Sequence, residues 1–221
     1  MEHTKIFSHV DHTLLSPTAT WEEICALCEE AMTHQVASVC IPPSYVARVA
    51  EKYGDDLVVC TVIGFPLGYA ETAVKVFETK EAIRAGAREV DMVINLGDVK
   101  HGDFEKITEE IRALKQAAGD QILKVIVETC YLTEEEKIKL CGCVTEAGAD
   151  YIKTSTGFGT GGATVEDIIL FREHIGSGVK MKASGGIRTE EDMVRLIELG
   201  CDRLGTSSAV KILCGVQGDG Y

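Results

Sequence analysis

The feature that most constrains this chain is a repeated alternation between short runs rich in β-branched residues and longer amphipathic runs. Short apolar runs bounded by turn residues are typical of strands that are buried on both faces, and a 3.6-residue apolar period indicates helices. A strand followed by a helix, repeated along the chain, favours a parallel sheet covered by helices. The pattern therefore predicts an α/β fold.

Eight such pairs can be counted. The predicted strands lie near 8–13, 36–41, 57–63, 89–95, 122–128, 150–154, 179–183 and 203–206. The predicted helices lie near 20–33, 44–53, 71–85, 104–118, 133–147, 164–175 and 190–199, with a short one from Ser208. Eight pairs in 221 residues suit a compact (β/α)₈ TIM barrel. An open dinucleotide-binding sheet is disfavoured because residues 12–17, after the first strand, contain no glycine.

The barrel is expected to form one domain over residues 1–221, because no Pro-, Ser- or Gly-rich linker interrupts the chain before a flexible tail at 215–221. A weak internal repeat supports it. Gly86, Gly148 and Gly200 each end a predicted helix, and five residues further on lie Asp91, Lys153 and Gly205. Two of these three equivalent inward positions are charged. A charge inside a barrel is costly unless it is paired or used.

Polar residues in otherwise apolar strands are the candidates for chemistry, since barrel enzymes carry their reacting groups at the carboxyl ends of strands. The candidates are Asp11, Cys40, Asp91, Asn95, Glu128, Lys153, Lys180 and Lys182. Asn95, Glu128 and His12 receive no role from the sequence.

Lys153 is the strongest candidate, because helices cover the outer face of a barrel strand and an inward lysine is rare there. Desolvation and a second ammonium would favour its neutral amine, which can attack a carbonyl and form a Schiff base. Lys180 and Lys182 are two residues apart and therefore face the same side of the predicted strand, so either can supply that ammonium. Asp91 can balance the charges and relay protons. Asp11 either assists through a water or forms a structural cap or ion pair.

A phosphate site is predicted in the loops after the last two strands, at 184–187 and 205–208. Backbone N–H groups of such loops, and the helix that follows, bind a dianion. Glycines and hydroxyl side chains make up most of both loops. The glycine-rich segment 157–162, which begins at Gly157 and follows Lys153-Thr154, is expected to close over a ligand.

Composition excludes several classes of partner. A formal charge of −13 repels nucleic acid and anionic membranes, so neither is expected as a partner. No signal peptide and no apolar run of spanning length is found, so a cytoplasmic location is expected. Nine cysteines, an odd number, indicate reduced thiols. The pairs at 25/28 and 141/143 lie in helical patterns without further ligands, so no zinc site is expected.

Four motifs make the chain resemble the deoxyribose-phosphate aldolase family. They are Lys-Thr-Ser-Thr-Gly at 153–157, Lys-Ala-Ser-Gly-Gly-Ile-Arg at 182–188, Val-Asp-Met-Val at 90–93 and Gly-Thr-Ser-Ser at 205–208. The similarity covers essentially the whole chain, in order and spacing. It implies reversible cleavage of 2-deoxy-D-ribose 5-phosphate to acetaldehyde and D-glyceraldehyde 3-phosphate, with small phosphorylated sugars and aldehydes as substrates. It also implies no metal or other cofactor, and a homodimer.

The resemblance also implies residue roles. Lys153 is the lysine that forms the Schiff base, and Lys182, rather than Lys180, is the lysine that perturbs the protonation of Lys153. Asp91 takes part in the proton relay. Cys40 resembles an active-site cysteine that the normal reaction does not require. Thr154, Gly157, Gly185, Gly186, Ser207 and Ser208 match substrate- and phosphate-binding positions, whereas Phe158 stands where some members carry a phosphate-binding lysine.

The C-terminal tyrosine of the family is thought to enter the closed site and help move the α-proton of the substrate. This chain ends in Tyr221. The seven residues after Cys214 can extend roughly 20 Å, enough to return to the barrel mouth. The alternative is a terminus without a role in catalysis.

Two other functions fit the scaffold. A phosphosugar isomerase or synthase would need an acid–base pair but not Lys153, and an inactive barrel would bind a phosphosugar without chemistry.

Overall fold

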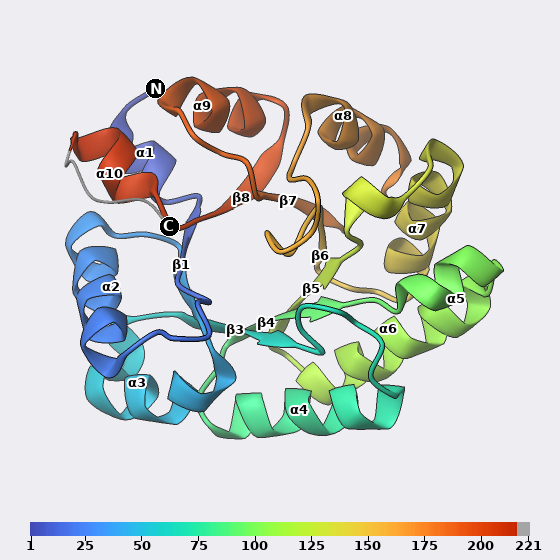
Figure 1. The fold of residues 1–221 in the computed structure, drawn as a ribbon, viewed down its shortest axis with the longest axis horizontal. Helices are drawn as coiled ribbons and strands as arrows, with labels where there is room; N and C mark the ends of the chain where they lie inside the picture. The colour runs from blue at the N-terminus through green and yellow to red at the C-terminus, as the bar shows by residue number, and fades with distance from the viewer. Residues whose placement is uncertain (216–221) are drawn as a thin grey trace.

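The computed structural model describes residues 1–215, and these form a closed barrel of eight parallel strands surrounded by helices (Figure 1). Each strand pairs with the next along the chain, and β8 closes the ring on β1. The strands are β1 (Val10–Thr13), β2 (Ser38–Ile41), β3 (Val59–Ile63), β4 (Glu89–Val93), β5 (Ile122–Ile126), β6 (Tyr151–Lys153), β7 (Lys180–Ser184) and β8 (Cys201–Thr206). The predicted (β/α)₈ barrel is confirmed.

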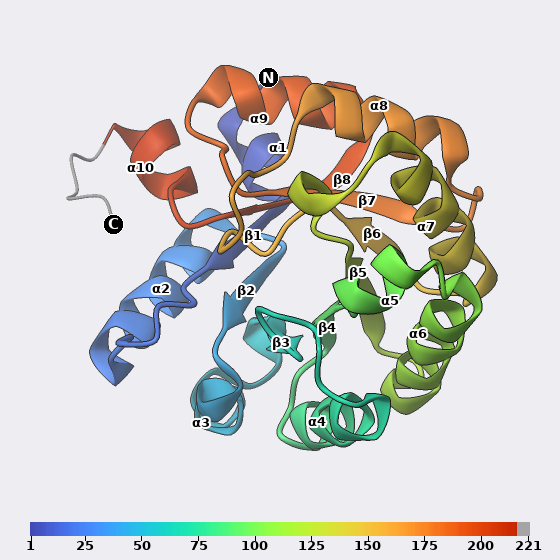
Figure 2. The same ribbon diagram turned by 45° about the vertical axis from the view of Figure 1, so that its right-hand side comes forward.

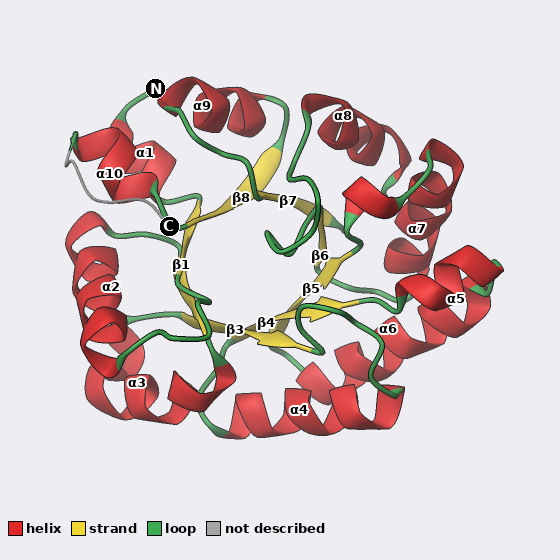
Figure 3. Ribbon diagram, viewed as in Figure 1, coloured by secondary structure: helices red, strands yellow, loops and turns green. Residues whose placement is uncertain are grey.

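Helices form the outer layer, which is clearest where the elements are coloured by type (Figure 3). They are α1 (His3–Phe7), α2 (Trp21–His34), α3 (Val46–Tyr53), α4 (Thr72–Arg84), α5 (Leu96–His101), α6 (Phe104–Ala118), α7 (Glu134–Glu146), α8 (Val165–His174), α9 (Glu190–Glu198) and α10 (Ala209–Cys214). Short 3₁₀ helices lie at Pro43–Tyr45, Gly54–Asp56 and Thr129–Tyr131. In the turned view α10 stands to one side of the barrel, beyond β1 (Figure 2).

The sequence places the helix starts accurately because several carry explicit caps. Thr20 and Glu23 form a capping box at the start of α2, and Thr133 and Glu136 form another at α7. Each box satisfies two backbone N–H groups that would otherwise lack a partner. These boundaries agree with the predicted ones to within one residue.

The main apolar core lies between the strands and the helices. Ile24 of α2, Ile107 and Ile111 of α6, and Phe171 of α8 are fully or almost fully buried there. The strands contribute their outward side chains to this layer, so that their inward side chains are left to fill the barrel. Polar residues at the inward positions are therefore buried and need partners.

The helix-end repeat also has the predicted geometry. Gly86, Gly148 and Gly200 have φ of 111°, 74° and 107°, a region that favours glycine, and each lies just before a strand. No helix within residues 1–215 is long and apolar enough to span a bilayer.

Candidate active site

Strand register brings charged side chains together inside the barrel. Asp91 of β4 is the register partner of Lys124 of β5, and Lys153 of β6 is the partner of Lys182 of β7. Lys182 is in turn opposite Arg203 of β8. Because neighbouring parallel strands lie about 4.8 Å apart, register partners on the same face lie within contact distance. Charged groups from several strands thus converge in the interior.

Lys153 is buried, with 3% of its surface exposed, and its Nζ donates to Asp91 Oδ2 at 2.7 Å. Lys153 also lines a cleft at the carboxyl ends of the strands. Its amine therefore has one carboxylate partner on the inner side and open space on the other. This arrangement suits a nucleophile that must meet an incoming carbonyl.

Lys182, and not Lys180, is the second lysine of this group. Its Nζ is fully buried and donates to Asp91 Oδ2 at 2.7 Å and to Asp11 Oδ2 at 2.5 Å. Two ammonium groups therefore share one oxygen of Asp91. Lys180 is exposed and stacks over the Tyr151 ring at 5.7 Å.

The contacts around Gly205 explain why this inward position, equivalent to Asp91 and Lys153 in the repeat, has no side chain. A Cβ at this position would lie 3.1 Å from Lys182 Cε and 2.8 Å from Ser184 Cβ. The missing side chain leaves room for Lys182 to cross toward Asp11.

Three further members of the cluster were not predicted from the sequence. Lys124 Nζ donates to Glu89 Oε2 at 2.5 Å and to Asp91 Oδ1 at 3.0 Å. Arg203 donates to both oxygens of Glu89 at 2.9 and 3.0 Å and to Asp11 Oδ1 at 2.8 Å. The signal was present: Glu89 lies two residues before Asp91, and Lys124 interrupts the apolar run 122–126. Side chains two apart on a strand share a face.

The electrostatics of the cluster fix most of its protonation states. Burial alone would raise the pKa of the Asp91 carboxyl, but the ammonium groups of Lys124, Lys153 and Lys182 hold it well below its ordinary range. Burial would lower the pKa of Lys182, but Asp11 and Asp91 more than offset this and raise it. The pKa of Lys124 is raised against burial by Asp91 and other neighbours. At neutral pH Asp91 is therefore an anion, and Lys182 and Lys124 are cations.

The cleft that Lys153 lines has a volume of about 570 Å³ and brings together most of the residues predicted to bind phosphate. They are Gly157, Gly185, Gly186, Ser207 and Ser208. Gly185 and Gly186 have φ of 77° and 76° and therefore need glycine. Arg188, which is exposed, and Phe158 also line the cleft.

The β6–α8 loop reaches toward the middle of the strand ring, as Figure 1 shows, and lies on the β7–α9 loop. The Ala163 N–H donates to Ser184 O at 3.1 Å and to Gly185 O at 3.0 Å. A Cβ at Gly162 would lie 2.3 Å from the backbone of Gly185. Glycine at 162 therefore allows two walls of the cleft to touch.

Thr154 lies behind the cleft rather than in its lining. It is fully buried, donates to Ser184 O at 3.2 Å and accepts from the Ser184 N–H at 3.1 Å, which joins β6 to β7. Cys40 faces the barrel interior beside Cys60, its register partner. A hydrogen bond with the Cys60 thiol lowers the pKa of Cys40. Tyr221 lies outside the described residues.

The three polar residues without a predicted role have structural contacts. Asn95 accepts from the Gly97 N–H at 3.0 Å and caps α5. The buried His12 contacts Glu30 through Nε2 at 2.9 Å. Glu128, at φ 56°, accepts from the Thr156 N–H at 3.1 Å and thus holds the segment that follows Lys153.

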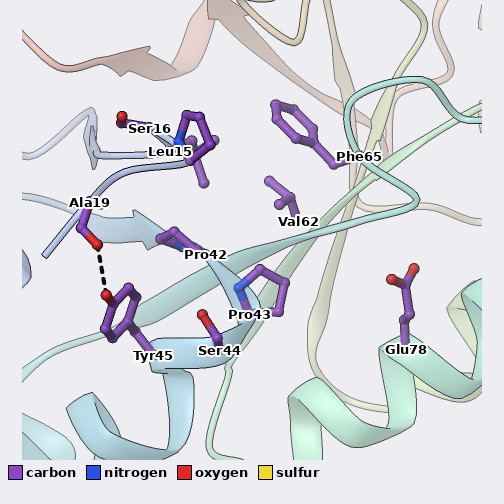
Figure 4. A pocket seen from close by; sticks show the side chains of 11 residues that line it. Leu15, Ser16, Ala19, Pro42, Pro43, Ser44, Tyr45, Val62, Phe65 and Glu78 are labelled. Carbon is purple, nitrogen blue, oxygen red and sulfur yellow. Dashed lines mark hydrogen bonds between the residues drawn. The ribbon is translucent and has the colours of Figure 1, made fainter. Parts of the chain in front are cut away.

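A second cavity of about 280 Å³ adjoins the cleft at the same face of the barrel (Figure 4). The two share the segment Leu15–Pro17. Val62 and Phe65 form an apolar wall, and Tyr45 Oη donates to Ala19 O at 2.7 Å on the opposite side. The Phe65 ring meets the Phe158 ring edge-on, with centroids 5.3 Å apart. The mouth therefore combines a polar glycine–serine side with an apolar side.

A closed barrel whose buried lysine opens into a cleft at the carboxyl ends of the strands has the architecture of the (β/α)₈ enzymes. Comparison with known proteins narrows this class. The sequence profile described as "DeoC/LacD family aldolase" matches residues 5–210. The chain belongs to the DeoC/LacD aldolase family.

Individual relatives agree. A deoxyribose-phosphate aldolase of Clostridium botulinum (strain Alaska E43 / Type E3) is 60% identical over 221 residues, covering 100% of both chains. One from Clostridioides difficile (strain 630) is 58% identical over 213 residues, covering 96% of each chain. Among solved structures, a tetrameric deoxyribose phosphate aldolase from Aeropyrum pernix superposes with a TM-score of 0.90 at 33% identity, covering 97% of this chain and 92% of that one.

Proposed function

We propose that this chain catalyses the reversible cleavage of 2-deoxy-D-ribose 5-phosphate to D-glyceraldehyde 3-phosphate and acetaldehyde, through a Schiff base on Lys153. Its full-length relatives at 58–60% identity are deoxyribose-phosphate aldolases. The observation that carries the residue assignment is the position of Lys153, whose Nζ contacts Asp91 at 2.7 Å and borders the cleft. The family and the geometry thus support the same chemistry.

The first steps need an amine and a proton carrier. Neutral Lys153 Nζ attacks C1 of the open-chain sugar, and the carbonyl oxygen leaves as water after two proton transfers, which yields an iminium. Asp91 Oδ2, at 2.7 Å from Nζ, is the group that takes and returns these protons, directly or through water.

Cleavage follows from the iminium. The C3 hydroxyl gives up its proton to the Asp91 carboxylate, directly or through water. Its oxygen forms the carbonyl of glyceraldehyde 3-phosphate, and the electron pair of the C2–C3 bond moves toward the nitrogen to give an enamine. Protonation of the enamine carbon and hydrolysis release acetaldehyde and regenerate the amine. The iminium is the electron sink, so the proposed route requires no metal.

The phosphate end of the substrate is assigned to the loops after β6, β7 and β8. Gly157, Gly185 and Gly186 offer backbone N–H groups, and Ser207 and Ser208 add hydroxyls at the same cleft. Arg188, which lines the same cleft, supplies a positive charge in a protein of net charge −13. This is the local attraction that an acidic protein needs for a dianion, in the absence of a lysine at position 158.

Trapping of the covalent intermediate tests the proposal. The protein is incubated with acetaldehyde or deoxyribose phosphate, reduced with borohydride and digested, and the added mass is located by mass spectrometry. The expected product is one adduct, on Lys153, which is lost in Lys153→Leu and kept in Lys180→Met. An unmodified protein, or an adduct on another lysine, contradicts the proposal.

Three finer predictions belong with this function. A homodimer and a contribution of Tyr221 to movement of the α-proton follow from the sequence resemblance, and a cytoplasmic location is predicted from the sequence itself. Size-exclusion chromatography with light scattering tests the first. A chain ending at residue 220 tests the last, because it should retain Schiff-base formation but exchange the α-proton more slowly.

A further inference from the structure

The buried ion-pair network that includes Lys153 has more cationic than anionic members. The buried network consists of Asp11, Glu89, Asp91, Lys124, Lys153, Lys182 and Arg203, joined by contacts of 3.5 Å or less. Four of its members are cationic and three are carboxylates. With all seven ionised, the network holds one uncompensated positive charge in the barrel interior. Such a charge is expensive where water is excluded.

The excess charge is removed at least cost at Lys153. Among the described residues, Lys153 contacts one carboxylate, that of Asp91. Lys182 contacts the carboxylates of Asp11 and Asp91, and Arg203 contacts those of Asp11 and Glu89. Lys124 contacts the carboxylates of Asp11, Glu89 and Asp91. Loss of a proton from Lys153 therefore breaks one ion pair, whereas loss from another member breaks two or three.

We infer that Glu89, Lys124 and Arg203 are positioning residues that set the protonation of Lys153, by fixing the network at one cation more than its carboxylates can balance. This inference rests on the proposed function, in which Lys153 must be neutral to react. None of the three lines the cleft with Lys153. They act through the charge that they place beneath it.

Within residues 1–215, few other titratable groups face the network. Cys40 of β2 and Cys60 of β3 point into the barrel, and the Cys60 thiol donates to Asp91 Oδ1 at 3.2 Å. The ring of Tyr151 lies 6.0 Å from Lys124 Nζ and 5.8 Å from the Arg203 guanidinium carbon. Thiols and a phenol are neutral when protonated, so they do not change the count: the network holds four cations against three carboxylates when Lys153 is protonated, and three against three when it is not.

The inference predicts pH shifts of opposite sign. Lys124→Met removes one cation and keeps most of the side-chain volume. Lys153 should therefore hold its proton to higher pH, and the pH midpoint of Schiff-base formation should rise. Glu89→Gln removes one carboxylate, so Lys153 releases its proton at lower pH and the midpoint falls. A unit charge at this depth changes a neighbour's titration by about one pH unit or more. Arg203→Met should act like Lys124→Met but more weakly, because Arg203 does not contact Asp91.

The experiment measures, at each pH, the initial rate at which acetaldehyde and borohydride label Lys153. Lys180→Met on β7 and Glu135→Gln on α7 are matched controls, because they change the net charge equally at exposed positions and should leave the midpoint unchanged. The double variant Lys124→Met/Glu89→Gln restores the count and should return the midpoint to that of the wild type. Thermal unfolding checks that each variant is folded.

The double variant also protects the test against a folding failure. If Lys124→Met alone does not fold, comparison of Glu89→Gln with the double variant isolates the Lys124 charge, and the midpoint must rise between them. The inference is overturned if the midpoints stay within 0.3 pH unit of one another, or if they move in the same direction in both single variants. In either case, labelling of Lys153 in the wild type leaves the aldolase proposal intact. If the wild type is not labelled at all, the aldolase proposal itself fails.

Discussion

At the scale of single residues, the site depends on which of two adjacent lysines keeps its proton. Lys182 is fully enclosed by Asp11 and Asp91, whereas Lys153 shares Asp91 and borders open space. The same residue type therefore serves two purposes. The enclosed lysine is a fixed cation, and the one at the cleft can exchange its proton and react.

Removal of the nucleophile should separate catalysis from folding. In Lys153→Leu, Asp91 keeps Lys182 at 2.7 Å and Lys124 at 3.0 Å, so no carboxylate is left unpaired and the fold should persist. Turnover of deoxyribose phosphate should fall by about a thousand-fold or more, because the covalent intermediate cannot form. Steady-state kinetics and circular dichroism together check this. Retention of more than a tenth of the activity in a folded variant would mean that the covalent route is wrong.

Removal of the fixed cation should have a different signature. Lys182→Met takes away the ammonium that shares Asp91 Oδ2 with Lys153, so Lys153 alone neutralises that oxygen and holds its proton more firmly. The pH–rate profile should move upward by about one unit or more, and Schiff-base formation at pH 7 should slow about ten-fold. Stopped-flow formation of the borohydride-sensitive adduct measures both. An unshifted profile contradicts the role given to Lys182.

At the scale of elements, the cleft depends on contact between two loops. The β6–α8 loop reaches the β7–α9 loop at Gly162, where even one methyl group would overlap the Gly185 backbone. On its other side the same loop is held by Glu128, which accepts from the Thr156 N–H and hydroxyl. The phosphate end of the cleft is therefore shaped by contacts between turns and not by a single element.

Gly162→Ala tests this arrangement. The added Cβ should push the two loops apart and raise KM for deoxyribose phosphate by roughly ten-fold or more, since ångström displacements of binding groups carry costs of this order. Labelling of Lys153 by acetaldehyde, which has no phosphate, should change much less. Gly161→Ala is the neighbouring control, because its Cβ would meet only Cys130 Cβ at 3.2 Å. Equal losses with both substrates would show that the loop contact does not serve the phosphate.

Elements were predictable where the sequence carries a full period or a cap. α6 was predicted at its observed bounds, and α2 and α7 to within one residue, because each combines amphipathic spacing with an N-terminal signal. α1 and α5 were missed since five or six residues are too few to show a helical period. The strand positions were sufficient to place Lys153 and Asp91 on the inner face.

The rest of the candidate site could not be predicted because it depends on register. Lys180 and Lys182 face the same side of a strand, so the sequence could not distinguish them. The structure does so by their positions along β7: Lys182 lies inside the barrel and reaches Asp11, while Lys180 lies at the exposed start of the strand. Lys124 and Glu89 were not predicted, although Lys124 is in register with Asp91 and Glu89 lies two residues before Asp91 on the same face of β4. A search for charged residues at every inward position would have found them.

At the scale of the whole molecule, the buried network ties the barrel together across its interior. Its members come from β1, β4, β5, β6, β7 and β8, so strands on opposite sides of the ring are joined by ion pairs. Breaking one partner of such a buried pair is far more costly than removing the pair, because the remaining charge is left unpaired. The stability of the barrel should therefore follow the ionisation of its carboxylates.

The sign of that dependence follows from the pKa directions. Burial alone would raise the pKa of Asp11 and Asp91, but the surrounding cations lower both below the ordinary value of 3.8. A carboxyl with a depressed pKa in the folded state stabilises the fold above its unfolded pKa, and this stabilisation is lost as pH falls toward the folded value. The free energy of unfolding should thus decline below about pH 4. The raised pKa values of Lys124 and Lys182 act at the alkaline end, where stability declines as pH rises beyond about 10.5.

Asp11→Asn should make the free energy of unfolding depend less on pH in acid, because it removes one of the buried carboxylates. Between pH 6 and pH 3 the wild type should lose about 1 kcal/mol more of its unfolding free energy than the variant, because the variant has one fewer carboxyl that must be protonated in acid. The variant should also be less stable at pH 6, since Lys182 and Arg203 lose a charged partner. Urea unfolding followed by circular dichroism at several pH values measures both effects, with the exposed Asp120→Asn as the control. If the wild type and Asp11→Asn curves run parallel, the ion pairs of Asp11 do not stabilise the barrel, and its carboxylate must be explained by catalysis alone.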